Sequence, residues 1–421
     1  MRVVTLGPPG RDLYHGSMDL QIRSCAPEQL GPFLETTEAA FAEEWHAEES
    51  ENFHRIIEAD RCIYMADGDA MVGTAGAFTF SMSVPGGDVP TAGVTLVGVL
   101  PSHRRKGILT KLMQHQIADI HARREPLAAL WASEGTIYGR YGYAVASLQG
   151  GTDIERDRAT FRDDPGAVGE VRLVRAEQAP KLFDPIYEQV RRTRPGMYSR
   201  TDDFWSVHTL NDNPQHRHGA GPLFCALHQS SGRADAYAFY RVSHDWDGSP
   251  ASRLIVREAL GIDVQATREI WRFLFGIDLI DRIQARSLPI DHPLHLMLRE
   301  PRRLRQTIGD ALWLRIVDVE AALAARSFAT ADRVVISIED PLCPWNAGPW
   351  LLDTTGTSAS VTTTEDAPEV TLTASDLAAV YLGGFTLAQF ARAGLVEPSD
   401  ALDRLDAMLH TSISPYCSGT F

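Results

Sequence analysis

A strand, a basic turn, an amphipathic helix and a second strand follow one another between residues 93 and 132. The apolar runs at 93–100 and 127–132 are typical of buried strands. Between them, one apolar helix face is formed by Leu109, Leu112, Met113, Ile117 and Ile120. This β-α-β unit predicts an α/β layered fold for the first part of the chain.

The residues before this unit have a different spacing of apolar side chains. Residues 20–69 are predicted to be mostly helical, with two amphipathic helices, because apolar residues recur at helical spacings among many glutamates. Strands are then predicted at 62–65 and 71–80, joined by a hairpin turn at Asp67-Gly68. The Gly/Pro-rich segment 7–16 is predicted to be an extension that carries no chemistry.

The chain is too long for one core, because its 421 residues exceed the roughly 100 to 200 residues of a typical domain. A polar, turn-rich stretch at 162–166 indicates a linker, and we place the first boundary near residue 150. A second α/β stretch follows without a phosphate-binding loop, and then an α+β stretch. The predicted domains are 1–150, 151–305 and 306–421.

The elements of the last two predicted domains come from the same periodicity arguments. In the second domain, helices are predicted at 179–192 and 266–275, and strands at 237–242, 253–261 and 279–286. In the third domain, a helix is predicted at 319–325, strands at 333–339, 358–363 and 369–373, and further helices after them.

Composition excludes several classes of protein. A formal net charge of −15 argues against a nucleic-acid partner, because a phosphate backbone is bound by a basic surface. The five scattered cysteines, without a C-x-x-C pair, favour a reducing compartment. No apolar run approaches the ~20 residues of a membrane span. We therefore expect a cytoplasmic protein with no nucleic-acid or membrane partner and no metal site.

The basic turn before the amphipathic helix has the composition of an anion site. Arg104, Arg105 and Lys106 supply three cations, and Gly107 allows close approach of the backbone. A helix start offers unpaired N–H groups and the positive end of its dipole, which favour a diphosphate. The alternative is that three successive basic residues form a solvated turn.

The pattern Val97-x-Val99-x-Pro101-x-x-Arg104-x-x-Gly107-Ile108 resembles the acetyl-CoA signature of the GNAT superfamily of N-acetyltransferases. The resemblance implies that the pantetheine arm and thioester carbonyl are bound by Val97, Gly98 and Val99. It implies a pyrophosphate-binding turn made of Arg104, Arg105, Lys106, Gly107, Ile108, Leu109 and Thr110. Leu109 departs from the pattern, since many members have a second glycine or alanine there.

A second resemblance lies in Ile137-Tyr138-Gly139-Arg140-Tyr141-Gly142-Tyr143, which is similar to the aromatic segment of the same superfamily. It implies that Tyr138 protonates the departing thiolate of CoA. A phenol with a pKa near 10 still holds its proton at neutral pH and can donate it. Ser133 and Glu134, just upstream, are also expected to bind the cofactor. The alternative is that these aromatic residues only pack a turn.

Longer stretches resemble the Eis (enhanced intracellular survival) acetyltransferases of actinobacteria. These are Pro90-Thr91-Ala92-Gly93, His103-Arg104-Arg105-Lys106-Gly107, residues 132–143 and Leu312-Trp313-Leu314-Arg315-Ile316. The resemblance implies an N-terminal GNAT domain, a central GNAT-like domain without a cofactor site and a C-terminal domain similar to sterol carrier proteins. It also implies acetyl-CoA as co-substrate, acetylation of aminoglycosides at several positions and a homohexamer.

The same resemblance implies that the terminal carboxylate of the chain, on Phe421, is the catalytic base. An α-carboxyl is ionised at neutral pH, and the small residues before Phe421 would let the chain enter a pocket. Thr420 replaces the acid that stands next to last in the best-known members. Because chain ends are usually frayed, the alternative is an end without a function.

An acidic stretch favours a small cationic amine as the acceptor. Residues 35–60 contain nine acids and one arginine, so their net charge is −8. The predicted acceptor-binding residues are Phe41, Glu43, Glu44 and Phe53. The alternative is that these glutamates mark the solvated face of a helix. Two other functions stay open: acetylation of lysines in proteins or peptides, and lipid or sterol binding by a protein with a vestigial GNAT domain.

Overall fold

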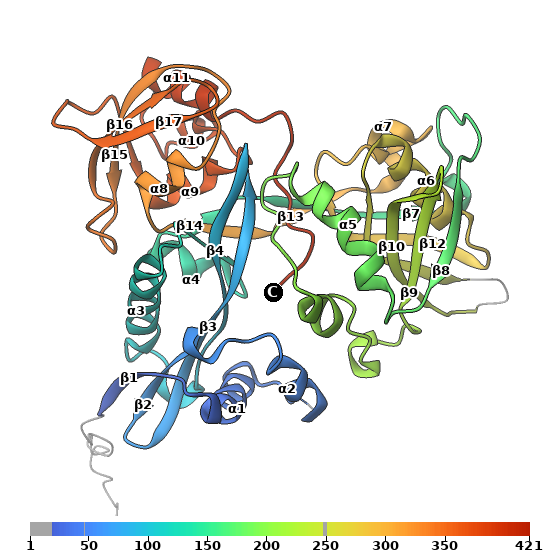
Figure 1. Ribbon diagram of the computed structural model, residues 1–421, viewed down its shortest axis with the longest axis horizontal. Helices are drawn as coiled ribbons and strands as arrows, with labels where there is room; N and C mark the ends of the chain where they lie inside the picture. Colours follow the sequence, from blue (N-terminus) through green and yellow to red (C-terminus); the bar gives the residue numbers. More distant parts are fainter. Residues whose placement is uncertain (1–18, 46, 247–250) are drawn as a thin grey trace, which may run out of the picture.

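The computed structural model describes residues 19–45, 47–246 and 251–421, so the segment 7–16 lies outside the described residues. Figure 1 shows three units: an N-terminal unit in blue and teal, a central unit in green and yellow, and a C-terminal unit in orange and red. The end of the chain lies between the first two units (Figure 1). No helix of the described residues is long and apolar enough to cross a membrane.

The N-terminal unit is a seven-stranded sheet with helices on both faces. In spatial order its strands are β1 (Leu20–Ser24), β2 (Ile63–Asp67), β3 (Ala70–Val84), β4 (Gly87–Val99), β5 (Leu127–Trp131), β14 (Leu312–Ile316) and β6 (Ala144–Val145). Phe78 and Phe80 of β3 share one core with α1 (Leu30–Phe41), whereas Ala75 and Ala77 face α3 (Ile108–Ala122). Successive residues of β3 therefore serve opposite faces. The shorter helices are α2 (Ala47–Phe53) and α4 (Gly135–Tyr138).

The central unit is a second seven-stranded sheet. In spatial order its strands are β13 (Thr307–Asp310), β7 (Leu148–Glu155), β12 (Ile280–Pro289), β11 (Ser252–Gly261), β10 (Arg233–Ser243), β9 (Phe224–Ser230) and β8 (Glu170–Val174). Its helices are α5 (Ala179–Arg191), α6 (Val264–Gly276) and the single turn α7 (Leu294–Met297). The two predicted helices of this part, and its three predicted strands, are confirmed.

The C-terminal unit is a four-stranded sheet packed against helices. Its strands, in spatial order, are β17 (Ala359–Thr363), β16 (Gly348–Thr354), β15 (Arg333–Glu339) and β18 (Val370–Thr373). Its helices are α8 (Val319–Ala324), α9 (Ala374–Tyr381), α10 (Leu387–Arg392) and α11 (Asp400–Leu409). Two units with seven-stranded α/β sheets, followed by a smaller α+β unit, agree with the expected fold class.

Two sequence expectations need correction. Residues 307–316 were predicted to belong to the third domain, but residues 307–310 form β13 and pair with β7 in the central sheet, and residues 312–316 form β14 and pair with β5 and β6 in the N-terminal sheet. Residues 20–24, predicted to be helical, form β1 and pair with β2. In both cases a strand-to-strand pairing across a long stretch of chain decides the structure, and periodicity within a short window carries no signal for it.

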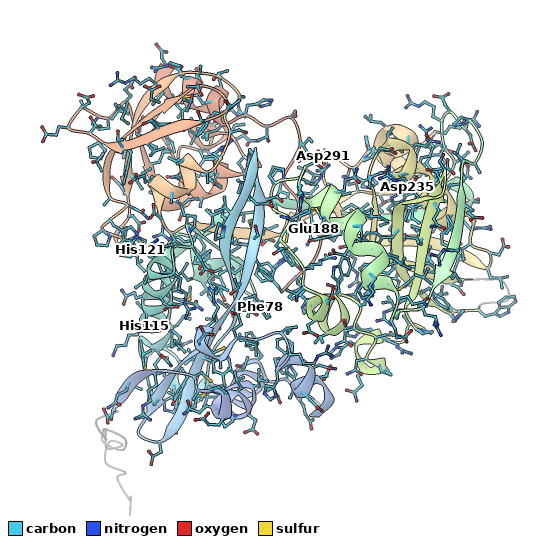
Figure 2. The ribbon with its side chains drawn as sticks, in the orientation of Figure 1. Phe78, His115, His121, Glu188, Asp235 and Asp291 are labelled. Carbon is cyan, nitrogen blue, oxygen red and sulfur yellow. The ribbon has the colours of Figure 1, made fainter. Side chains whose placement is uncertain are left out.

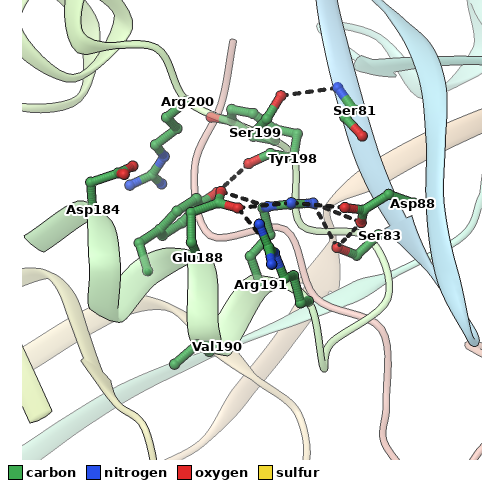
Figure 3. A network of polar contacts seen from close by, with 12 residues as sticks. Ser81, Ser83, Asp88, Asp184, Glu188, Val190, Arg191, Tyr198, Ser199 and Arg200 are labelled. Atoms are coloured by element: carbon green, nitrogen blue, oxygen red, sulfur yellow. Dashed lines mark hydrogen bonds and ion pairs between the residues drawn. The ribbon is translucent and has the colours of Figure 1, made fainter.

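The N-terminal and central units are joined by a charge network around the buried side chain of Arg191 (Figure 3). The Arg191 guanidinium of α5 donates to both carboxylate oxygens of Asp88 on β4 at 2.8 and 2.9 Å, and to Glu188 at 2.7 Å. Burial raises the pKa of Asp88, but hydrogen bonds from Arg191 and Ser83 outweigh it and hold that pKa below its usual value. Next to this network, residues 196–199 exchange backbone hydrogen bonds with Ser81 and Ser83 of β3.

Arg315 ties the aromatic segment of the N-terminal unit to the C-terminal unit. Its side chain is fully buried and pairs with Asp340 at 2.6 Å. Gly142 has a φ of +81°, and a Cβ at that position would lie 2.5 Å from Arg315 Nη1. The glycine therefore leaves room for the guanidinium to reach Asp340.

We expect Gly142→Ala to lower the free energy of unfolding by about 3 kcal/mol, because the methyl group would push the guanidinium away from Asp340 in addition to straining the backbone. Gly232→Ala is the matched control: its φ is +77° and nothing lies within 4 Å of a Cβ there. That variant should lose only about 1 kcal/mol. The measurement is urea unfolding of both variants, and equal losses would contradict the explanation.

Candidate active site

A cavity of about 700 Å³ opens in the N-terminal unit. It lies between the end of α1, the second half of β4, the turn that leads into α3, and the segment after β5. Its lining residues are Ala40, Phe41, Val97, Gly98, Val99, His103, Arg104, Arg105, Gly107, Ile108, Leu109, Thr110, Ser133, Glu134, Thr136, Ile137, Tyr138, Arg140 and Tyr141. The cavity thus gathers most of the predicted cofactor residues from segments that are distant in sequence.

The cavity exists because two parallel strands stop pairing. β4 and β5 are in register only from Thr91 to Gly93, which face residues 127–129. Past Gly93 the two strands diverge, and the edge of β4 that would face β5 borders the cavity. Backbone N–H and C=O groups along such an edge need partners, so this edge is suited to bind an extended ligand that carries amide groups.

A β-bulge re-aims the last residues of β4. Leu96 has a φ of +53°, and the pairing with β3 shifts between Thr74 and Gly76. The Thr74 hydroxyl donates to the Leu96 carbonyl at 2.9 Å and is itself 3.0 Å from the Thr37 hydroxyl of α1. These buried contacts fix the bulge and hence the direction of Val97.

The turn into α3 forms an open cradle. Arg105 and Gly107 both have positive φ, at 62° and 78°, and nothing lies within 4 Å of a Cβ built on Gly107. The first N–H groups of α3 lie beyond this open space and lack intrahelical acceptors. This arrangement fits the diphosphate of a CoA molecule, since backbone donors and the helix dipole both favour an anion.

The three basic residues of the turn differ in their surroundings. The Arg104 guanidinium donates to the carbonyls of Val99 at 3.3 Å and Ala40 at 2.9 Å, so it ties the turn to β4 and α1. Arg105 lines the cavity, whereas Lys106 is exposed and is not among the lining residues. The structure therefore assigns Arg104 a role in holding the turn that the sequence did not indicate.

Tyr138 ends helix α4 and is 6% exposed. Burial raises the pKa of its phenol, while a hydrogen bond with Ser133 lowers it, and the net shift is upward. The ring packs edge-on against Tyr143, with centroids 6.0 Å apart. At neutral pH the hydroxyl thus holds its proton inside the cavity, as an acid that protonates a thiolate must.

Several lining residues were not predicted as site residues. Arg140 is an exposed cation at the cavity, held by a hydrogen bond from its Nε to the Ile137 carbonyl at 3.0 Å. The Tyr141 hydroxyl lies 3.2 Å from the hydroxyl of Thr110 on α3. Arg140 and Tyr141 both belong to the aromatic segment 137–143 that the sequence analysis identified. The charge of Arg140 and the hydroxyl of Tyr141 could therefore have marked them as site residues.

The chain terminus lies where β4 and β5 begin to diverge. The Phe421 ring packs against Phe80 and Tyr198 at centroid distances of 5.1 and 5.2 Å. A Cβ on Gly93, the last β4 residue paired with β5, would lie 3.3 Å from this ring. The last residue is therefore packed into the structure and not frayed, although it is not among the residues that line the cavity.

The predicted acceptor residues are not all brought together. Phe41 lines the cavity, but Glu43, Glu44 and Phe53 are not among its lining residues. Glu43 accepts a hydrogen bond from the Trp45 indole at 3.1 Å, and Phe53 stacks on that indole. The described residues contain no group of three or more His, Cys, Asp or Glu side chains that could hold a metal ion.

Family models match all three units. Residues 21–146 and 196–316 each match an acetyltransferase (GNAT) domain, and residues 319–418 match a sterol carrier protein domain. The second match ends with β14, which agrees with a C-terminal unit that starts after this strand.

Similar proteins cover nearly the whole chain. An N-acetyltransferase of Streptomyces avermitilis is 39% identical over 88% of this chain and 91% of its own length. The N-acetyltransferase Eis of Mycobacterium tuberculosis is 32% identical over 94% of this chain and 98% of its own. The crystal structure of Eis1 from Mycobacterium abscessus superposes with a TM-score of 0.84 at 31% identity, covering 95% of this chain and all of that one.

We expect Gly107→Asp to weaken acetyl-CoA binding by more than about 100-fold, because a carboxylate would face the diphosphate across the open cradle. The measurement is calorimetric titration with acetyl-CoA. Gly232→Asp is the control, since it introduces the same side chain at a similar φ of +77° in an open turn of the central unit. An unchanged affinity of the Gly107 variant would rule out a diphosphate at this turn.

Proposed function

The chain belongs to the Eis family of N-acetyltransferases in the GNAT superfamily, and we propose that it transfers the acetyl group of acetyl-CoA to amines of polycationic small molecules such as aminoglycosides. The observation that carries this proposal is the fork of β4 and β5, where a buried tyrosine lines the cavity and the terminal phenylalanine packs at the point of divergence. The proposed proton donor, Tyr138, and the ring of the last residue are thus both found at this fork.

In the proposed reaction, bound acetyl-CoA supplies the acetyl group, and the acceptor amine attacks the thioester carbonyl directly. The backbone of Val97 to Val99 holds the arm of the thioester and polarises its carbonyl. The Phe421 carboxylate takes the proton that the amine loses as its C–N bond forms. The Tyr138 phenol gives its proton to the sulfur as the C–S bond breaks, so no covalent enzyme intermediate is needed.

Charge supports a cationic acceptor. Residues 35–60 have a net charge of −8, and Ala40 and Phe41 at the end of α1, within this stretch, line the cavity. A negative surface next to a site raises the local concentration of polyamines. The alternative acceptor is a lysine side chain of a protein or peptide, which the same chemistry would acetylate.

The test of the function is release of CoA from acetyl-CoA with three acceptor classes: aminoglycosides, linear polyamines and lysine peptides. We expect the highest kcat/KM with aminoglycosides and, by mass spectrometry, more than one acetyl group per molecule. A preference for lysine peptides would replace the proposed substrate class. No release with any amine would contradict the proposal.

Tyr138→Phe should lower kcat by about 10²- to 10⁴-fold while acetyl-CoA still binds, because the thiolate loses its proton donor. Tyr64→Phe is a matched control: Tyr64 is 5% exposed in the same unit and does not line the cavity. Turnover and calorimetric affinity should be compared for both variants. If the Tyr138 variant keeps a turnover close to that of the parent, Tyr138 is a packing residue and not the proton donor.

Adding one glycine after Phe421 should abolish most activity, because the negative charge moves by up to ~3.6 Å and bond-making geometry tolerates about 1 Å. Every side chain stays intact, so acetyl-CoA affinity should not change. The control is the same glycine added ahead of Met1. If the extended chain acetylates aminoglycosides at the parent rate, Phe421 is not the base and Glu43 or Glu44 has to be tested.

A further inference from the structure

The central unit repeats the fork of the N-terminal unit. Strand β11, helix α6 and strand β12 follow one another, and β11 pairs parallel with β12 only from Ser252 to Val256. Past Val256, β12 continues beside β7, so the two parallel strands diverge as β4 and β5 do. The repeat agrees with the match of residues 196–316 to a GNAT model.

The start of α6 differs from that of α3. The Asp263 carboxylate caps the helix and accepts from the Ala266 N–H at 2.8 Å, so it places a negative charge where a diphosphate would lie. A Cβ on Gly261 would lie 2.4 Å from the Thr267 nitrogen, whereas the space at Gly107 is open. The helix start of this second fork is therefore unsuited to CoA, although its strands still diverge.

The C-terminal segment of the chain occupies the diverging part. The Tyr416 hydroxyl donates to the Ser287 carbonyl of β12 at 3.1 Å. The Ser418 hydroxyl accepts from Arg200 Nη2 at 2.9 Å. Arg200 in turn donates to both carboxylate oxygens of Glu258 on β11, at 3.1 and 2.8 Å. Glu258 of β11 and Ser287 of β12 each lie two positions past the last parallel pair, Val256 and Ala285. Ser287 contacts the tail directly, and Glu258 contacts it through Arg200.

Further contacts hold the tail along its length. Ser414 donates its N–H to Asp291 at 3.0 Å and accepts at its carbonyl from Arg194 at 2.8 Å, where the tail meets the central unit (Figure 2). The Tyr416 N–H donates to the Pro195 carbonyl at 2.8 Å. The Tyr198 hydroxyl donates to the Thr420 carbonyl at 3.3 Å. These partners all belong to the central unit, and the Phe421 ring packs between Tyr198 of this unit and Phe80 at the fork of the N-terminal unit.

We infer that the central unit uses its diverging strands as a binding site for the chain's own residues 414–420, and that Arg200 is the positioning residue that fixes where the Phe421 carboxylate lies. The positioning role rests on the proposed function of that carboxylate. The binding site for the tail does not depend on the proposed function, because it concerns only which part of the protein holds the tail.

A purely structural role is the rival explanation for Arg200. The side chain is 1% exposed, pairs with Glu258 and lies over the rings of Tyr187 and Trp205 at 4.0 and 4.5 Å. Removing it would leave a buried, unpaired carboxylate and could unfold the central unit. A decisive variant therefore has to leave the ion pair intact and change only the contacts of the tail.

The experiment uses the full-length chain with two sets of variants. The double variant Tyr416→Phe/Ser418→Ala removes the hydrogen bonds of the tail side chains to Ser287 and Arg200 and keeps the Arg200–Glu258 pair. Arg200→Lys keeps the charge but loses the planar fork that reaches Glu258 and Ser418 together. The control is Arg191→Lys, because Arg191 is as deeply buried at the same interface and pairs with Asp88 and Glu188 instead of the tail.

The first readout is the rate at which a carboxypeptidase releases Phe421. Loss of the contacts with Ser287 and Arg200 should raise the open population of the tail, and hence this rate, by at least roughly 30-fold. Arg200→Lys should raise it by at least about tenfold and lower kcat by a similar factor, with acetyl-CoA affinity unchanged. The Arg191 control should release Phe421 within about twofold of the parent rate.

Two outcomes would overturn the inference: a parental release rate in the double variant, or an equal acceleration in the Arg191 control. The release assay needs no catalysis, so it is independent of the proposed function. If the glycine-extended chain keeps its activity while the double variant releases Phe421 faster, the tail site stands and the carboxylate is not the base. If the extension abolishes activity but release stays parental in the double variant, the base assignment stands and the tail site does not.

Discussion

The cavity of the N-terminal unit depends on two parallel strands, β4 and β5, that stop pairing after Gly93. A buried strand edge without a partner is costly, so the divergence of β4 and β5 is stable only where something else satisfies the backbone. The bulge at Leu96 turns the last residues of β4 toward the cavity, and the helix that follows offers its own unpaired N–H groups. Strand edge and helix start together form one extended surface for amide and phosphate groups, bordered by Tyr138.

The same constraint occurs twice in this chain and is met in two ways. In the N-terminal unit the fork keeps an open cradle at its helix start, while in the central unit Asp263 and the close backbone at Gly261 fill the corresponding place. In the central unit, protein groups contact the diverging strands instead: the Tyr416 hydroxyl donates to the Ser287 carbonyl, and Arg200 pairs with the side chain of Glu258. One fold can therefore keep an open helix start in one unit and a contact with its own chain in another.

Local sequence patterns predicted much of this structure, and their failures share a cause. Helix α3, strands β4 and β5 and the residues from Val97 to Thr110 follow from periodicity and one motif, because they are neighbours in sequence. Strand β14 was assigned to the wrong unit because its pairing partners lie some 170 to 190 residues earlier. Arg104 and Arg200 act through backbone carbonyls and a buried carboxylate, and neither contact leaves a trace in composition. Glu43 and Phe53 were selected by charge and aromaticity, which do not indicate the direction of a side chain.

A carboxylate at the end of a chain is positioned by everything that holds the chain. The tail's hydrogen bonds go to the central unit, but its last ring packs between Phe80 of the N-terminal unit and Tyr198 of the central unit. The distance between the terminal carboxylate and the cavity therefore depends on how the two units sit against each other. The backbone pairing of residues 196–199 with β3 fixes that relation a short way along the same interface. In this arrangement the central unit, without a helix start suited to phosphate, still determines the geometry of the neighbouring site.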